Sequence, residues 1–396
     1  MDPFPRPRDT LAGDLRFRIR MWDTLSHSDA ERFFAVPAES ISSEAGRRSI
    51  LAAMSGVLYV PASRADLSAD VLRLVEMGVT SVILDLEDGI HDGSLPAARD
   101  NVAKALQRLG TRWAGAAAPL ALFLRVRTLE DVAACLGAGG AGVLAGLVIP
   151  KCDGEILQDF GSRLDSAGAG TLWLMPVVET ADFVRATTRR DALAALQEAV
   201  LQQRDRVLAV RFGSVDLAGV FGARLEHGIS IYDVPLLASA LGDLTSVISA
   251  PGVSIPVAGS VHERYEDVDD VGPGLRGTSP YESHGITQLP GLTREVFLDR
   301  ASGLWGKSVI HPLQVMIVNS MAPVSWADFQ DASRIGVAHR GGAEASHGRS
   351  RMNEPKPHSG WAEATLIRAG ACGVLRKDVR SVDILEAVRG VGSAKI

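Results

Sequence analysis

The chain has 396 residues, of which 46% are hydrophobic and 22% charged, with a formal net charge of −6. This charge and the lack of a basic run exclude an extended nucleic-acid surface, which needs clustered Lys and Arg. No apolar run is long enough to span a bilayer, and the N-terminus lacks the apolar centre of a secretory signal. The three cysteines, Cys135, Cys152 and Cys372, are far apart, so we expect reduced thiols in a cytoplasm and no zinc site.

The first 55 residues are expected to form an extension, because Pro3, Pro5 and Pro7 open it and a polar, charged stretch follows. From Gly56 onward the residue pattern changes, and short apolar runs recur. In chain order they are VLYV (57–60), VILDL (82–86), LALFLRV (120–126), LAGLVIP (144–150), TLWLMPVVE (171–179), RVLAVRFG (206–213), VSIPVAGS (253–260) and SVIHP (308–312).

Amphipathic segments of helical length separate most of these runs. In ADLSADVLRLVEMG, for example, Leu67, Val71, Leu74 and Val75 fall on one helical face. Apolar strands that alternate with helices predict a parallel sheet covered on both sides, and eight of them predict a (β/α)8 TIM barrel. An open doubly wound sheet is the alternative, although no GxGxxG motif follows the first strand.

Two polar stretches interrupt the pattern. Residues 262–290 form a long insert before the eighth strand, and residues 340–360 are rich in Gly, Ser and charge, which predicts a loop or a flexible lid. A helix is expected at 361–375. The predicted organisation is an N-terminal extension at 1–55, a TIM-barrel domain at 56–321, and a C-terminal lid and helical segment at 322–396.

Polar side chains follow most of the predicted strands. They are Asp85, Glu87 and Asp88 after strand two, Arg125 and Arg127 after strand three, Lys151 after strand four, Glu179 after strand five, Asp216 after strand six and His311 after strand eight. The active site of a parallel barrel lies at the carboxyl ends of its strands, so these side chains should share one rim.

Several carboxylates on one rim must be protonated, paired with Arg or Lys, or bound to a cation. Two carboxylates with open water positions suit Mg²⁺, and an arginine suits a substrate carboxylate. Structural explanations stay open: Glu179 and Asp216 could stabilise helix N-termini. Arg125 could simply pair with a neighbouring acid, Lys151 could form a structural ion pair, and His311 could cap a turn.

The same residues carry a family resemblance. The stretches LYVPASRADL, VILDLEDGI, FLRVRT, LVIPKCDG, LMPVVETADFV, VRFGSVDLAGVFG and GLWGKSVIHPLQVMIVN occur in order between Val57 and Asn319. Together they resemble the citrate lyase β-subunit (CitE-like) group of the HpcH/HpaI aldolase superfamily, and more closely a divergent bacterial branch of C–C bond lyases. The resemblance implies a TIM barrel with Mg²⁺-dependent carbon–carbon lyase chemistry.

The resemblance also implies residue roles. Glu179 matches the family's metal-binding glutamate, and Asp216 matches its metal-binding aspartate. Arg125 matches the arginine that grips the keto-acid carboxylate and the developing enolate. Glu87 and Asp88 match the LED pair beside the metal's waters. Lys151 matches the PK lysine, to which we assign an electrostatic role.

Family members usually form trimers or hexamers, and a C-terminal segment closes over a neighbour's site. Many relatives carry an M-V-D-x-P segment whose Asp is an acid/base at that neighbouring site. Here Met352–Pro355 reads MNEP, so Glu354 is the candidate, with Lys356 and His358 close by. Arg127 departs from the family's Asn.

The predicted function is therefore that of a Mg²⁺-dependent lyase or aldolase that cleaves or forms a 2-hydroxy or 2-keto acid adduct, free or as a CoA thioester. One alternative is a CoA-independent aldolase acting on free keto acids. Another is a non-catalytic, metabolite-binding barrel with a regulatory role. Phosphate binding by the glycine-rich segment 138–146 is disfavoured, because those glycines precede a strand.

Overall fold

Eight parallel strands close into a barrel. The computed structural model describes residues 15–136, 140–166, 170–226, 228–265, 286, 289–337, 342–346 and 351–393. The barrel strands are β4 (Gly56–Pro61), β5 (Ser81–Asp85), β6 (Ala121–Arg125), β7 (Leu144–Ile149), β8 (Trp173–Val178), β9 (Val210–Phe212), β10 (Val257–Val261) and β11 (Trp305–Val309). Because β11 pairs with β4, the ring is closed. The prediction of a (β/α)8 barrel is confirmed, and the open sheet is excluded.

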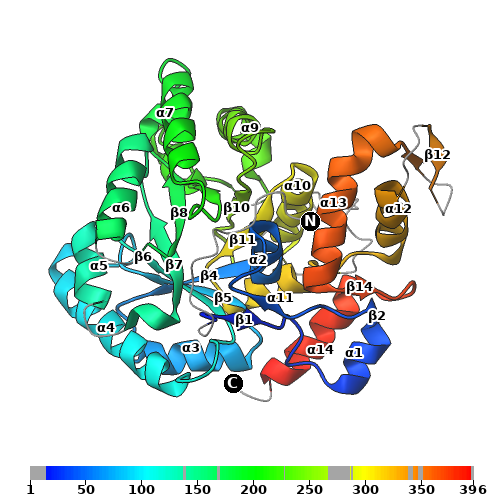
Figure 1. Ribbon diagram of the computed structural model, residues 1–396, viewed down its shortest axis with the longest axis horizontal. Helices are drawn as coiled ribbons and strands as arrows, with labels where there is room; N and C mark the ends of the chain where they lie inside the picture. The colour runs from blue at the N-terminus through cyan, green and yellow to red at the C-terminus, as the bar shows by residue number, and fades with distance from the viewer. Residues whose placement is uncertain are drawn as a thin grey trace.

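Helices surround the barrel on its outer side (Figure 1). They are α3 (Leu67–Glu76), α4 (Leu95–Arg112), α5 (Leu129–Leu136), α6 (Gly154–Ser166), α7 (Arg189–Gln202), α8 (Ser214–Gly219), α9 (Pro235–Ile248), α10 (Pro290–Ala301) and α11 (Pro312–Ser320). Helix α3 shows why such segments fold this way: Asp66 caps its N-terminus, and Leu67, Val71 and Leu74 are buried.

The eighth strand was predicted at 308–312, and this position is wrong by three residues. Strand β11 spans Trp305–Val309, since His311 caps the next helix and Pro312 begins it. Proline at the first helical position needs no amide hydrogen, so the sequence favours a helix start there.

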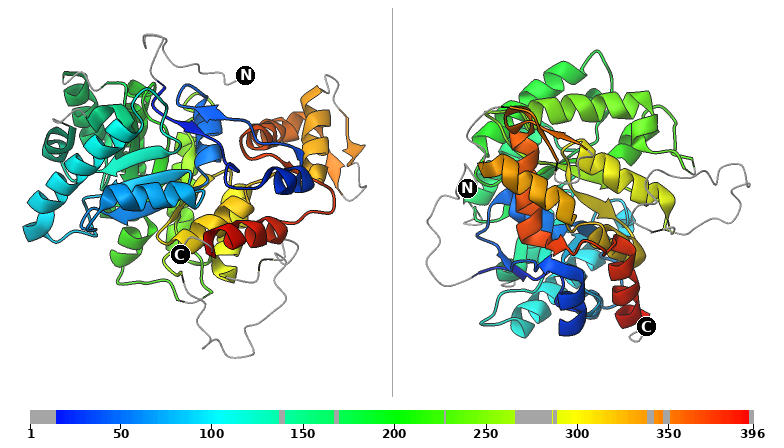
Figure 2. Two further views of the ribbon diagram at one scale, coloured as in Figure 1. Left: turned by 90° about the horizontal axis from the view of Figure 1, so that it is seen from below. Right: turned by 90° about the vertical axis from the view of Figure 1, so that its right-hand side faces the viewer.

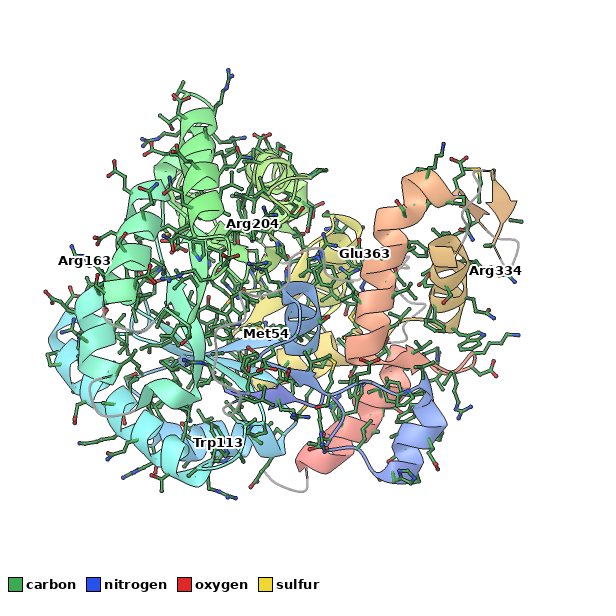
Figure 3. All side chains as sticks on the ribbon, viewed as in Figure 1. Met54, Trp113, Arg163, Arg204, Arg334 and Glu363 are labelled. Carbon is green, nitrogen blue, oxygen red and sulfur yellow. The ribbon has the colours of Figure 1, made fainter. Side chains whose placement is uncertain are left out.

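The N-terminal segment folds against the base of the barrel. It contains β1 (Arg18–Ile19), α1 (His27–Phe33), β2 (Phe34–Val36), β3 (Ile41–Ser42) and α2 (Arg47–Met54). Arg47 Nε donates to the carbonyl of Val207 at 2.8 Å, and Thr80 Oγ1 donates to the carbonyl of Met54 at 2.9 Å. Met54 is fully buried and lies near the middle of the view in Figure 3. Helix α2 thus closes the amino-terminal mouth, and the carboxyl-terminal mouth is left for chemistry.

The C-terminal segment packs beside the barrel (Figure 2). It contains α12 (Trp326–Val337), β12 (Glu344–Ala345), β13 (Met352–Asn353), α13 (Pro355–Cys372), β14 (Val374–Leu375) and α14 (Ser381–Ser393). Strand β14 pairs antiparallel with β2, which joins the two ends of the chain. The helix predicted at 361–375 instead begins at Pro355, another proline at a first helical position.

Some of the predictions concern residues outside the described ranges. Most of the insert at 262–290, and residues 338–341 and 347–350 of the region around the predicted lid, lie outside the described residues. The three-part division at residues 55 and 321 stays a prediction. Within the described ranges, no helix combines the length and the hydropathy needed to cross a membrane.

Candidate active site

The carboxyl-terminal mouth of the barrel gathers the predicted charged residues. Asp85 ends β5 and Arg125 ends β6, and the parallel register places these two residues directly opposite each other. Lys151 follows β7, and Glu179 follows β8. The six residues Glu87, Asp88, Arg125, Lys151, Glu179 and Asp216 form one connected group through the contacts described below.

Arg125 is held by three carboxylates. Its Nε and Nη2 donate to the two oxygens of Asp85 at 2.6 and 2.7 Å. Its Nη1 lies 2.9 Å from Glu87 Oε2 and 3.3 Å from Asp88 Oδ2. Burial alone would lower the pKa of Arg125, but these acids, chiefly Asp85, raise it above its usual range. The guanidinium is therefore a fixed cation, with the Nη1 edge facing the other rim residues.

Asp85 has a positional role that the sequence did not assign. It is the last residue of β5, and both Asp85 and Glu87 are buried. Asp85 accepts both hydrogen bonds from the Nε/Nη2 edge of Arg125. This edge is therefore not open to a substrate carboxylate.

Lys151 is positioned by a strained backbone. Its φ is +48°, which is uncommon for a residue with a side chain. In this conformation its N–H donates to Glu179 Oε1 at 2.8 Å, while Nζ pairs with Glu87 and lies 3.7 Å from Asp216 Oδ1. Burial would lower the pKa of Lys151, but Glu87 foremost, followed by the other acids, raises it. Lys151 is thus a cation and not a free amine.

Glu179 is a buried acid beside a second acid. Its side chain is 5% exposed, and burial, with a further contribution from Asp216, raises its pKa to about 7. The Glu179 carboxylate fits here because residue 213 is a glycine. A Cβ at residue 213 would lie only 2.3 Å from Glu179 Oε2. Asp216 lies in the first turn of α8.

These two carboxylates fit a hard cation. Burial disfavours the negative charge on Glu179. A cation bound between Glu179 and Asp216 would favour the ionised form of Glu179 again. No group of three or more His, Cys, Asp or Glu that could hold a metal occurs among the described residues. Mg²⁺ is commonly held by one or two carboxylates together with water and substrate oxygens, so the donor set suits Mg²⁺.

Glu87 and Asp88 are neighbouring acids whose pKa values shift in opposite directions. Burial and a hydrogen bond with Asp88 raise the pKa of Glu87. The pKa of Asp88 is lowered, because its bond with Glu87 and the nearby cations outweigh burial. Neighbouring acids whose pKa values move apart suit proton transfer.

Arg127 explains the departure from the family's Asn. It donates to the carbonyls of Leu86, Glu87 and Ile90, and it pairs with Asp92. Arg127 therefore fastens the loop after β5, which carries Glu87 and Asp88. It is a positioning residue.

Glu354 is not brought to this rim within one chain. Glu354 precedes α13. Its backbone N–H donates to His358 Nδ1 at 2.9 Å, which is a contact within the C-terminal segment. Helix α13 packs against α12 and α2, beside the barrel in Figure 1. In the described part of the chain, no contact joins Glu354 to the rim.

Two further sequence interpretations can be checked. His311 caps α11, with Nδ1 accepting from the N–H of Leu313 at 3.2 Å, so the interpretation of this residue as a cap is confirmed. The described part of the glycine-rich segment, from Gly140, forms a turn before β7, and residues 138 and 139 lie outside the described residues.

The family model for C–C bond lyases of the TIM-barrel fold matches residues 49–374. The chain therefore belongs to this family and is a carbon–carbon lyase, and the alternative of a non-catalytic barrel loses its support. The predicted resemblance to a branch of C–C bond lyases with a TIM-barrel fold is confirmed.

Two solved structures are similar to the chain. A citrate lyase from Burkholderia xenovorans LB400 has 17% sequence identity and a TM-score of 0.57, with 84% of this chain and 96% of that chain covered. The protein CitE from Mycobacterium tuberculosis, crystallised with magnesium, acetoacetate and coenzyme A, has 21% identity and a TM-score of 0.54, with 81% and 99% covered. At these identities the likeness shows the fold alone. No curated protein matches the chain.

Proposed function

We propose that the chain is a Mg²⁺-dependent lyase that cleaves or forms the carbon–carbon bond of a 2-hydroxy or 2-keto acid. The observation that carries the proposal is the buried Glu179. It fits because residue 213 is a glycine, and it lies close enough to Asp216 for that carboxylate to disfavour the charge on Glu179. Such an acid pair at the carboxyl ends of barrel strands is typical of a metal site.

Glu179 and Asp216 would hold the metal. When bound, Mg²⁺ supplies a Lewis acid that binds the oxygens of the substrate and stabilises the charge that develops on them. Arg125 and Lys151 contribute positive charge that is fixed before the reaction begins, because carboxylates hold both side chains in place.

The proton transfer is assigned to Glu87 and Asp88. Both carboxylates lie beside Lys151 and Arg125, so a proton can be taken up or released next to these cations. Glu354 keeps its proposed role as an acid/base only if a second copy of the chain places it at this rim. A trimer or hexamer is therefore part of the proposal.

The test is calorimetric titration of pyruvate, oxaloacetate and glyoxylate into the protein, with Mg²⁺ and then with EDTA. We expect binding that needs the metal and that Glu179→Ala abolishes. The control is the exposed Asp100, which pairs with Lys104 on α4: Asp100→Asn should bind as the parent does. Binding that persists in EDTA, or in Glu179→Ala, would contradict the proposed metal site.

A further inference from the structure

A groove of about 880 Å³ opens beside the rim. Its inner end is formed by Glu87, Asp88 and Lys151, and it continues outward along the N-terminal parts of α5 and α6. This volume is in the range of ligand sites. If a substrate is bound at the rim, any substituent that extends toward α5 and α6 must therefore enter the groove.

The groove has an apolar surface. It includes the side chains of Ile90, Leu129, Pro150, Ile156 and Phe160. Ile90, Pro150 and Phe160 are buried, and Leu129 and Ile156 are partly exposed. Contact with these side chains favours a substituent that has a hydrocarbon portion.

The charged part of the lining is predominantly acidic. Six carboxylates face three basic side chains, and each of those three already has an acidic partner. Lys151 pairs with Glu87, Arg127 with Asp92, and Arg163 with Asp159 at 2.7 Å. Figure 3 shows Arg163 on the outer edge of α6, away from the barrel. Among the described residues that line the groove, a phosphate group thus meets no basic side chain that is free of an acid.

The two helix ends at the groove are also occupied. Asp131 Oδ2 accepts from the N–H groups of Arg127 and Thr128 at 2.6 and 2.9 Å, at the start of α5. Asp153 Oδ1 accepts from the N–H of Ile156 at 2.9 Å, at the start of α6. Helix N-termini commonly bind phosphate, but here Asp153 takes one first-turn amide of α6, and Asp131 takes the two amides just before α5.

The first turns of these helices add further negative charge. Glu130 on α5 and Glu155 on α6 both line the groove, and both are exposed. In the described part of the chain neither side chain forms an ion pair, so their charges act on whatever occupies the groove. The repulsion of an anion is then the sum of both, weakened by salt.

We propose that the groove binds a substituent of the substrate that carries no phosphate, is uncharged or cationic, and includes an apolar portion. The substrate class is therefore a hydroxy or keto acid with such a substituent, and not a coenzyme A thioester. This inference rests on the proposed function, since it places the acid end of the substrate at the rim.

The test uses two probes that differ in their phosphates. S-acetylpantetheine and acetyl-CoA share the thioester and the amide-containing arm, and only acetyl-CoA carries phosphate. Their affinities are measured by calorimetry with Mg²⁺ and pyruvate present, at low and at high salt. We expect S-acetylpantetheine to bind at least about tenfold more tightly at low salt, which corresponds to about 1.4 kcal/mol. The ratio should decrease as salt screens the groove.

The variant Glu130→Gln/Glu155→Gln should reduce the ratio at least about threefold. The control is Glu198→Gln/Glu386→Gln, which makes the same change of charge at exposed positions of α7 and α14 outside the groove. We expect the control to keep the parent ratio.

Acetyl-CoA that binds as tightly as S-acetylpantetheine would overturn the inference, and so would binding of neither probe. Pyruvate alone reports on the proposed function. If pyruvate fails to bind with Mg²⁺, the rim assignment is wrong; if pyruvate binds and the probes are not discriminated, only the groove assignment is wrong.

Discussion

Gly213→Ala is expected to disable the rim without unfolding the barrel. Gly213 has a φ of −90°, which alanine adopts without strain, so the backbone itself tolerates the change. The added Cβ, however, would lie 2.4 Å from Glu179 Cβ, where ordinary contacts begin at 3.4 Å. Glu179 or the start of α8 must therefore move by about 1 Å.

A displacement of this size is large for a metal ligand. Metal–ligand distances are defined to about 0.2 Å, and a misplacement of about 1 Å can reduce catalysis about 100-fold. Overpacking of a filled interior costs about 1–3 kcal/mol of stability. We therefore expect at least about 100-fold weaker metal-dependent binding, with a fold that still forms.

The assay is titration with Mn²⁺ as a paramagnetic substitute for Mg²⁺, followed by water-proton relaxation, with urea unfolding measured in parallel. Gly219→Ala is the matched control, because Gly219 ends the same helix and a Cβ there meets nothing within 4 Å. Mn²⁺ binding in Gly213→Ala within about threefold of the parent would refute the reasoning, since about 1 Å of movement at a ligand cannot leave its affinity intact.

Three further outcomes are expected. Lys307→Met should destabilise the protein by about 3–5 kcal/mol in urea unfolding, since Lys307 Nζ lies 2.9 Å from the buried Glu295; the exposed Lys104→Met should cost less than about 0.5 kcal/mol. Because the folded pKa of Glu179 is raised to about 7, its contribution to metal-free stability is complete below about pH 4.5 and is lost as pH rises through 7. Apparent Mg²⁺ affinity should rise over the same interval and level off above it; a flat profile would contradict this assignment. Arg125→Lys should destabilise the protein by about 1–3 kcal/mol in urea unfolding, because an ammonium cannot reproduce the two bonds to the buried Asp85.

The sequence was sufficient for the barrel because apolar strands buried on both faces are recognisable without any long-range information. It was also sufficient to gather the six rim residues, since strand ends in a parallel barrel necessarily meet. The position of β11 was predicted less well. The apolar run at 308–312 includes the helix-capping His311, and a run of this kind does not show where a strand stops.

Other features depend on contacts between distant parts of the chain. The role of Gly213 follows from its distance to Glu179, which is 34 positions earlier, and no local pattern reports that distance. Arg127 fastens a loop some 40 positions away through backbone carbonyls, which leave no trace in the sequence. Whether Glu354 reaches a rim depends on a second copy of the chain, and a single sequence does not contain that geometry.

The pairing of charges around the rim has a consequence for how an acid is recognised. In the described part of the chain, Arg125, Lys151 and Arg127 each contact at least one carboxylate, so an incoming acid must compete with groups that are already well placed. A substrate carboxylate therefore gains little net attraction from these side chains. Glu179 and Asp216 are less fully paired. Lys151 Nζ lies 3.7 Å from Asp216 Oδ1 and the Lys151 N–H donates to Glu179, but neither contact matches the two short bonds between Arg125 and Asp85. The affinity for an anionic substrate must then come mainly from the cation that these two acids would hold, and this is why metal removal should abolish binding rather than merely weaken it.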